Sequence, residues 1–156
     1  MGLWASIVAV SLLHLLVTVL FLWHCPEAYM DETLHIPQVR RYCRGDFLQW
    51  DSKITTLPGT YLLSLVVMAP RIWWLGPEAC SVAALRTVNA LFLGPLATFL
   101  AAKVLQDIHG CSQHSAALGF RILRFALMPL HFFCCFLYYT DATSTSAVLL
   151  MYWLHR

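Results

Sequence analysis

Long apolar runs separated by short polar segments dominate this sequence. Residues 1–23 contain no Asp, Glu, Lys or Arg. As a helix they would reach about 35 Å, which is enough to cross a hydrocarbon core of about 30 Å. The run has no basic start and ends in bulky residues, where a cleaved signal peptide would end in small ones. We therefore predict an uncleaved membrane anchor.

Two later apolar segments predict further membrane spans. Residues 81–102 and residues 122–140 are each long enough to cross a bilayer. The first of them carries Arg86 and Asn89. A charge inside an apolar segment is costly, so Arg86 is a candidate functional residue. The alternative is that its side chain snorkels to the membrane surface.

Two other apolar segments are too short to cross alone. Residues 57–75 are interrupted by Pro70 and Arg71, and we interpret them as a short, re-entrant or interfacial segment. Residues 142–154 would extend only about 20 Å as a helix. We expect them to be an incomplete span, so that residues 1–156 form one truncated membrane domain.

Residues 24–56 are the longest polar segment, with five acids and four bases. Aromatic and branched residues interleave with these charges, as in amphipathic helices on a membrane surface. Residues 103–121 form a second polar loop, in which Lys103 and Arg121 favour the cytosol. If every apolar segment crossed, both loops would be lumenal. A re-entrant segment at 57–75 removes this conflict.

The composition also indicates a membrane protein. Hydrophobic residues make up 60% and charged residues 12% of the chain, against about 45–50% and about 25% in soluble domains. The net charge is +2 with scattered bases, which predicts no nucleic-acid partner. The chain has six cysteines and no CxxC pair. Cys25 and Cys43 lie in the same polar segment, and a lumenal location would allow a disulfide between them.

The strongest candidate for chemistry is the segment from Tyr29 to His35. Asp31 and His35 are four residues apart, so on a helix they share a face. With the neighbouring Glu32 they are suited to general-base catalysis; alternatively, the acids cap a helix N-terminus. Because no third metal ligand and no nucleotide fingerprint accompany them, we predict neither a metal nor a cofactor.

Two further places combine aromatic and acidic residues. Trp50 and Asp51 precede a Pro-Gly turn where the chain re-enters lipid. Tyr139 and Asp141 follow an apolar run. Each aromatic ring could contact a sugar, or it could anchor the chain in the aromatic belt at the membrane surface.

Four motifs occur in a recognisable order. They are Tyr-Met-Asp-Glu-x-x-His-x-Pro-Gln at 29–38, Trp-Asp-x-x-Ile-Thr-Thr-Leu-Pro-Gly-x-Tyr at 50–61, Leu-Arg-x-Val-Asn at 85–89 and Phe-Leu-Tyr-Tyr-Thr-Asp at 136–141. In this order they resemble the N-terminal part of the dolichyl-phosphate-glucose-dependent α-1,2-glucosyltransferase family of the endoplasmic reticulum. The resemblance extends over about residues 25–145, but family members are several times longer.

This resemblance implies a fold, a location and a reaction. The fold would be all-α and polytopic, of the GT-C type, with an amphipathic lumenal loop after the first span. The location would be the endoplasmic reticulum membrane, with the active face in the lumen. The donor would be dolichyl phosphate glucose and the acceptor the diglucosylated oligosaccharide on dolichyl diphosphate. The reaction would form the terminal α-1,2 linkage with inversion, in protein N-glycosylation. Membrane lipid would be the surrounding partner.

The resemblance also implies roles for individual residues. Asp31 would be the base, with Glu32 beside it to hold the acceptor. Arg86 would meet the dolichyl phosphate, and Asp141 would position substrate. The predicted substrate-binding set is His35, Trp50, Asp51, Arg86, Tyr139 and Asp141. The alternative is a catalytically inactive, truncated isoform that acts as a membrane interaction protein.

Overall fold

A computed structural model describes residues 3–110 and 116–155 of the chain, which form helices and contain no strand. The elements are α1 (Leu3–His24), α2 (Glu32–Cys43), α3 (Gly59–Leu75), η1 (Pro77–Ala79), α4 (Val82–Val88), η2 (Asn89–Leu93), α5 (Gly94–His109), α6 (Ala116–Ala126), α7 (Pro129–Phe136) and α8 (Asp141–Leu154). The fold is therefore all-α, as the apolar pattern predicts.

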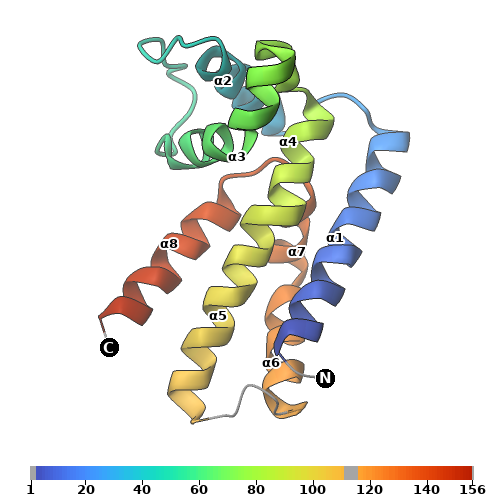
Figure 1. Cartoon of the computed structure of the whole chain (residues 1–156), viewed down its shortest axis with the longest axis vertical. Helices are drawn as coiled ribbons and strands as arrows, with labels where there is room; N and C mark the ends of the chain where they lie inside the picture. Colours follow the sequence, from blue (N-terminus) through green and yellow to red (C-terminus); the bar gives the residue numbers. More distant parts are fainter. Residues whose placement is uncertain (1–2, 111–115, 156) are drawn as a thin grey trace.

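The helices form a long bundle with a smaller unit at one end. α1, α5 and the α6–α7 pair run along the long axis, and α8 packs beside α5 (Figure 1). α2 and α3 lie together at the end where α1 finishes and α4 begins (Figure 1). We call this unit, residues 31–80, the polar cap.

Two helical stretches are long and apolar enough to cross a membrane. One is α1, and the other is Val82–His109, in which α4, η2 and α5 are continuous. The count rises to three if α6 and α7 together make one span, although they are bent by 71°. The bend follows from Pro129 at the start of α7, because proline has no N–H to donate to the preceding turn.

The predicted span at 122–140 stays a prediction, because α6 and α7 make a span only if the bent pair crosses as one unit. The helices of this region run from Ala116 to Ala126 and from Pro129 to Phe136. The predicted polar loop at 103–121 is also largely helical, since α5 continues to His109. Residues 111–115 of that loop lie outside the described part of the chain. Length and hydropathy alone could not detect a break of this kind.

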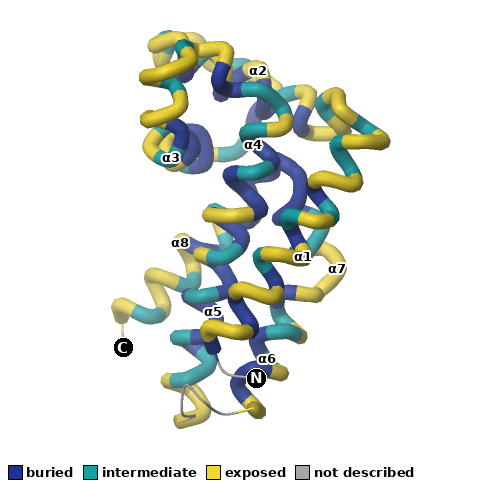
Figure 2. Tube along the Cα trace, turned by 45° about the vertical axis from the view of Figure 1, so that its right-hand side comes forward, coloured by how far each residue is buried: buried dark blue, intermediate teal, exposed yellow. Residues whose placement is uncertain are grey.

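Large apolar side chains cover the outside of the bundle. On α1 they include Trp4 and Trp23, near its two ends, which are 62% and 81% exposed. The buried positions face the interior, while exposed positions follow the outer side of α1 and α8 (Figure 2). An exposed apolar surface of this extent is typical of a lipid-facing helix.

A disulfide fixes the polar cap. It joins Cys43, the last residue of α2, to Cys80, directly after η1. The disulfide therefore ties the end of α2 to the segment that follows α3, and α3 lies across the same end of the bundle beside α2 (Figure 1). The alternative pairing of Cys25 with Cys43 is wrong, and Cys25 is a free thiol.

Candidate functional site

The candidate site begins with a strained turn before α2. Met30 has φ of 51°, in the left-handed region that few residues other than glycine adopt. Such a conformation costs about 1–3 kcal/mol and persists where its surroundings impose it. Here the Tyr29 N–H donates to Glu32 Oε2 at 3.0 Å. The turn therefore places Asp31 at the N-cap position of α2 with a fixed backbone.

Glu32 and Arg86 form a buried ion pair beneath this turn. Both side chains are 0% exposed, and Arg86 Nη2 lies 2.6 Å from Glu32 Oε2. Arg86 Nε donates to Glu32 Oε1 at 3.0 Å. The guanidinium also donates to the carbonyls of Cys25 and Glu27 and lies 5.0 Å from the centroid of the Phe21 ring. Arg86 is thus fully engaged inside the chain, and its predicted contact with a lipid phosphate would require this pair to open.

The same carboxylate holds the segment between α7 and α8. Tyr138 N–H donates to Glu32 Oε1 at 2.7 Å. With Tyr29 and Arg86 also bound, both oxygens of Glu32 are occupied by partners in the chain. Ser64 of α3 and the Tyr138 hydroxyl share a hydrogen bond of 2.8 Å. Glu32 therefore joins the start of α2, the end of α4 and the α7–α8 connection.

Asn89 also fixes the α7–α8 connection by hydrogen bonds. Its Nδ2 donates to the carbonyls of Leu137 at 2.6 Å and of Tyr139 at 3.0 Å. Asn89 begins the π-helical turn η2, and such turns are frequent at functional sites. Sequence analysis assigned no role to Asn89. The available signal was its spacing of three residues from Arg86, which puts both polar side chains on one face of an apolar helix.

Asp31 differs from its neighbour Glu32. Its residue is exposed, and its carboxylate does not cap α2. Its backbone N–H points to the Tyr139 hydroxyl at 3.4 Å. Asp31 and Glu32 do stand at the N-terminus of α2, as the capping alternative has it, but the Asp31 side chain makes no capping hydrogen bond. Its carboxylate is open to a ligand on a rigid backbone.

His35 and its aromatic neighbours lie one turn further along α2. His35 Nδ1 and the Tyr61 hydroxyl are 2.7 Å apart, and the Tyr139 ring lies 6.4 Å from the imidazole. Burial lowers the pKa of His35 below its usual 6.5, although the negative charges of Asp31, Asp141 and Glu32 partly oppose this. The imidazole is therefore neutral at pH 7. It is a positioned hydrogen-bonding group and not a competing cation beside Asp31.

Trp50 extends this aromatic wall from the loop after α2. Its ring centroid is 5.8 Å from that of Tyr61, it is 39% exposed, and its Nε1 donates to the Ile54 carbonyl. Gln38 of α2 fixes the loop, because its amide binds the backbone of both Gln49 and Asp51. The exposed part of the Trp50 ring is available to a ligand.

The two other predicted acids, Asp51 and Asp141, have different contacts. Asp51 accepts from the Lys53 N–H at 2.9 Å, which makes it part of a local turn. Asp141 is exposed at the start of α8 and lines a cavity of about 110 Å³ with His131 and Cys134. Within the described residues, no group of three or more His, Cys, Asp or Glu side chains is arranged to hold a metal ion.

The predicted site residues therefore fall into two groups. The first group is a chain of contacts that begins at the Asp31 backbone N–H, which points to the Tyr139 hydroxyl, and continues through His35 and the unpredicted Tyr61 to Trp50. The second group, Glu32 and Arg86, lies beneath it and holds these elements together. A carboxylate beside aromatic rings and a neutral imidazole can accept a proton from a hydroxyl of a polar, ring-shaped ligand.

The family model and three relatives that match this chain point to the same family. The model of the DIE2/ALG10 family matches residues 25–156. A protein of Gibberella zeae is 42% identical over 145 residues, covering 83% of this chain and 19% of its own length. An Arabidopsis thaliana protein is 41% identical, covering 81% and 26%, and a Homo sapiens protein is 43% identical, covering 81% and 28%.

All three relatives carry one name, Dol-P-Glc:Glc(2)Man(9)GlcNAc(2)-PP-Dol alpha-1,2-glucosyltransferase. The chain spans between about a fifth and somewhat over a quarter of the length of these relatives. No solved structure matches the chain significantly.

Proposed function

Because this chain belongs to the DIE2/ALG10 family, we propose that it contributes the catalytic base and part of the acceptor site to an α-1,2-glucosyltransferase. The donor is dolichyl phosphate glucose, and the acceptor is the diglucosylated oligosaccharide on dolichyl diphosphate. The observation that carries the proposal is the exposed, uncapped carboxylate of Asp31 on a strained turn that buried contacts hold in place. The alternative of a non-catalytic interaction protein is not favoured, because these relatives carry a transferase name.

In this proposal the reaction is a single displacement with inversion. The acceptor hydroxyl oxygen attacks the anomeric carbon of the glucose while the bond from that carbon to the phosphate oxygen breaks. The Asp31 carboxylate takes the hydroxyl proton, and the dolichyl phosphate leaves with the electron pair of the broken bond. The neutral imidazole of His35 and the hydroxyls of Tyr61 and Tyr139 position the acceptor sugar, against which the exposed Trp50 ring packs.

Glu32 and Arg86 have a supporting role in this proposal. Both are fully buried and bound to each other, so they position Asp31 and Tyr139 instead of contacting substrate. This revises the roles that the family resemblance implies for them. Asp141 remains a candidate for substrate positioning, since its charge acts on His35 together with that of Asp31.

We further propose that the polar cap faces the lumen of the endoplasmic reticulum. The Cys43–Cys80 disulfide is at this end, and disulfides persist in oxidising compartments. Arg121 and Arg124 of α6 lie toward the opposite end of the bundle and favour the cytosol. The disulfide and the arginines thus favour the same orientation in this proposal. That orientation requires that α3 does not cross the membrane, which is the re-entrant interpretation of residues 57–75.

Complementation tests the proposed function. Cells that lack terminal α-1,2-glucosyl transfer receive either the 156-residue chain or a chimera in which residues 25–156 replace the matching segment of the Arabidopsis relative. Lipid-linked oligosaccharides are then sized. The chimera restores the fully glucosylated species, and its Asp31→Asn variant loses at least about a hundredfold in rate, since a general base contributes about 10²–10⁴. The matched control is Asp46→Asn, in the loop after α2. Full activity of the Asp31→Asn chimera would refute the assignment of the base.

A further inference from the structure

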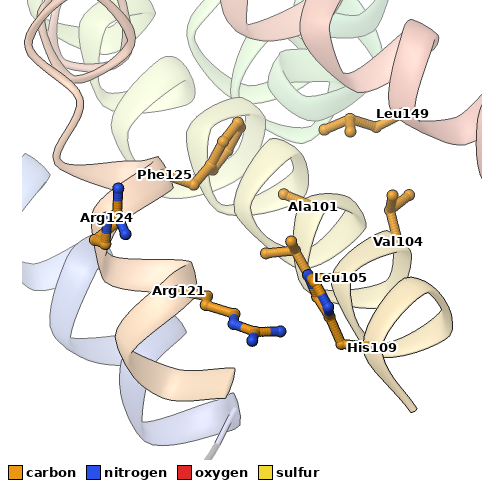
Figure 3. Close-up of a pocket in the computed structure, with 8 residues that line it drawn as sticks. All are labelled: Ala101, Val104, Leu105, His109, Arg121, Arg124, Phe125 and Leu149. Carbon is orange, nitrogen blue, oxygen red and sulfur yellow. The ribbon is translucent and has the colours of Figure 1, made fainter. Parts of the chain in front are cut away.

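Toward the end of the bundle opposite the polar cap, α5, α6 and α8 enclose a cavity of about 510 Å³. This volume is within the range of about 300–1,000 Å³ that is typical of small-molecule sites. Figure 3 shows the side chains that surround it. The wall is largely apolar, with Ala101, Leu105, Phe125 and Leu149, and the basic side chains are Arg121, Arg124 and His109.

The arginines of this cavity have no counter-ion among the described residues 3–110 and 116–155. In the described residues the ion pairs are Arg44–Glu78 and Arg86–Glu32, so neither Arg121 nor Arg124 is paired with a carboxylate. Arg121 Nη1 is buried and has no hydrogen-bond partner in the part of the chain that the structure describes, and its side chain extends across the gap toward α5 (Figure 3). A buried donor without a partner is costly. This nitrogen is therefore a donor that an anionic oxygen of a ligand would satisfy.

Basic groups next to an apolar wall suit a ligand that has both a charged and an apolar part. Two guanidinium groups suit a phosphate, whose oxygens accept charge-assisted hydrogen bonds, and the apolar wall suits a hydrocarbon chain. α5 belongs to the stretch Val82–His109, which is long and apolar enough to cross a membrane. α6 lies toward the end of the bundle opposite the polar cap, and basic side chains at a membrane surface attract anionic headgroups. We propose that this cavity binds an anionic phospholipid, with the phosphate on Arg121 and Arg124 and an acyl chain along Leu105, Phe125 and Leu149.

This site is separate from the proposed glucosyl-transfer centre. The helix Val82–His109 has 28 residues, which corresponds to about 42 Å, and it connects the region of Arg86 with His109 at the cavity. The glucose of the donor must reach Asp31 at the polar cap. A phosphate on Arg121 is too far away to be the donor phosphate, so the bound lipid stabilises or anchors the bundle.

Lipid retention tests the proposal on the 156-residue chain itself. The purified chain in detergent is incubated with phosphatidic acid or with phosphatidylcholine of the same acyl chains, and the retained lipid is quantified by native mass spectrometry. The chain retains phosphatidic acid in preference. Arg121→Gln lowers the apparent affinity about fivefold, as expected for one basic group at a membrane surface. Arg121→Lys, which keeps the charge, loses less.

Two further variants separate the proposal from a general effect of charge or folding. Lys53→Gln removes one exposed charge at the polar cap and leaves retention unchanged. Leu149→Trp narrows the apolar wall while every cation remains, and it lowers retention. Equal retention of phosphatidylcholine, unchanged retention by both Arg121→Gln and Leu149→Trp, or full competition by inorganic phosphate would each overturn the phospholipid proposal.

Discussion

Arg86 near the polar cap and Arg121 toward the opposite end of the bundle are both arginines of largely apolar helices, but their surroundings differ. Arg86 is fully buried and satisfied by one carboxylate and two carbonyls. Arg121 lines an open cavity and has a buried nitrogen that no described residue satisfies. The comparison teaches that a charge inside an apolar segment can be a structural link or a free binding group. What distinguishes the two is whether the rest of the chain brings a carboxylate to it.

The largest effect is expected from breaking the buried pair. Arg86→Met leaves the carboxylate of Glu32 buried without its cation, which costs about 3–5 kcal/mol in comparable pairs. The melting temperature of the purified chain in detergent should fall sharply, and much of the protein should fail to accumulate. The double variant Glu32→Leu with Arg86→Met should lose less than the two single variants together, because no unpaired charge remains.

The surface pair Arg44–Glu78 is the matched control for this experiment. Its side chains are 61% and 85% exposed, and exposed pairs contribute little to stability. Arg44→Gln should therefore melt close to the wild type. If Arg86→Met melted like Arg44→Gln, the view that the Glu32–Arg86 pair holds the site together would be wrong.

A smaller loss is expected from removing the disulfide of the polar cap. The Cys43–Cys80 bond joins residues that are 37 positions apart in the sequence. A disulfide that closes such a loop stabilises the folded state by about 2–4 kcal/mol. The double variant Cys43→Ser with Cys80→Ser should melt at a lower temperature. Cys25→Ser, which removes a free thiol, should leave the melting temperature unchanged. Labelling of Cys43 and Cys80 without reductant would contradict the pairing.

The smallest effect concerns the protonation of His35. Its pKa is lowered in the folded chain by burial, so below pH 6.5 the unfolded imidazole takes up a proton that the folded one does not. The contribution of His35 to the free energy of unfolding should therefore be fully present above pH 6.5. It should decline as the pH falls toward the pKa of His35 in the folded chain. His35→Gln should flatten this part of the decline, as seen in melting temperatures across mildly acidic pH. His24→Gln, at the exposed end of α1, is the matched control for the loss of a histidine.

The sequence predicted the all-helical fold and the residues around Asp31 because these depend on local signals. An uncharged run of 23 residues predicts a membrane helix by length and hydropathy alone. The adjacent acids and the histidine four residues beyond Asp31 indicate a candidate site through helical spacing. The break at Pro129 was not predicted, because the apolar pattern continues through it, although the proline itself was an available signal.

The sequence by itself determined that this chain is a helical membrane protein with acidic and aromatic residues after its first apolar helix. Only the tertiary structure decided that Glu32 is buried while Asp31 is open, because the partner of Glu32 is Arg86, 54 residues away. It also decided that Cys43 pairs with Cys80 instead of Cys25, and that Asn89 holds the α7–α8 connection. The physical reason is the same in each case. The free energy of a charge, a thiol or an amide depends on which distant groups surround it, and spacing along the chain does not specify those groups.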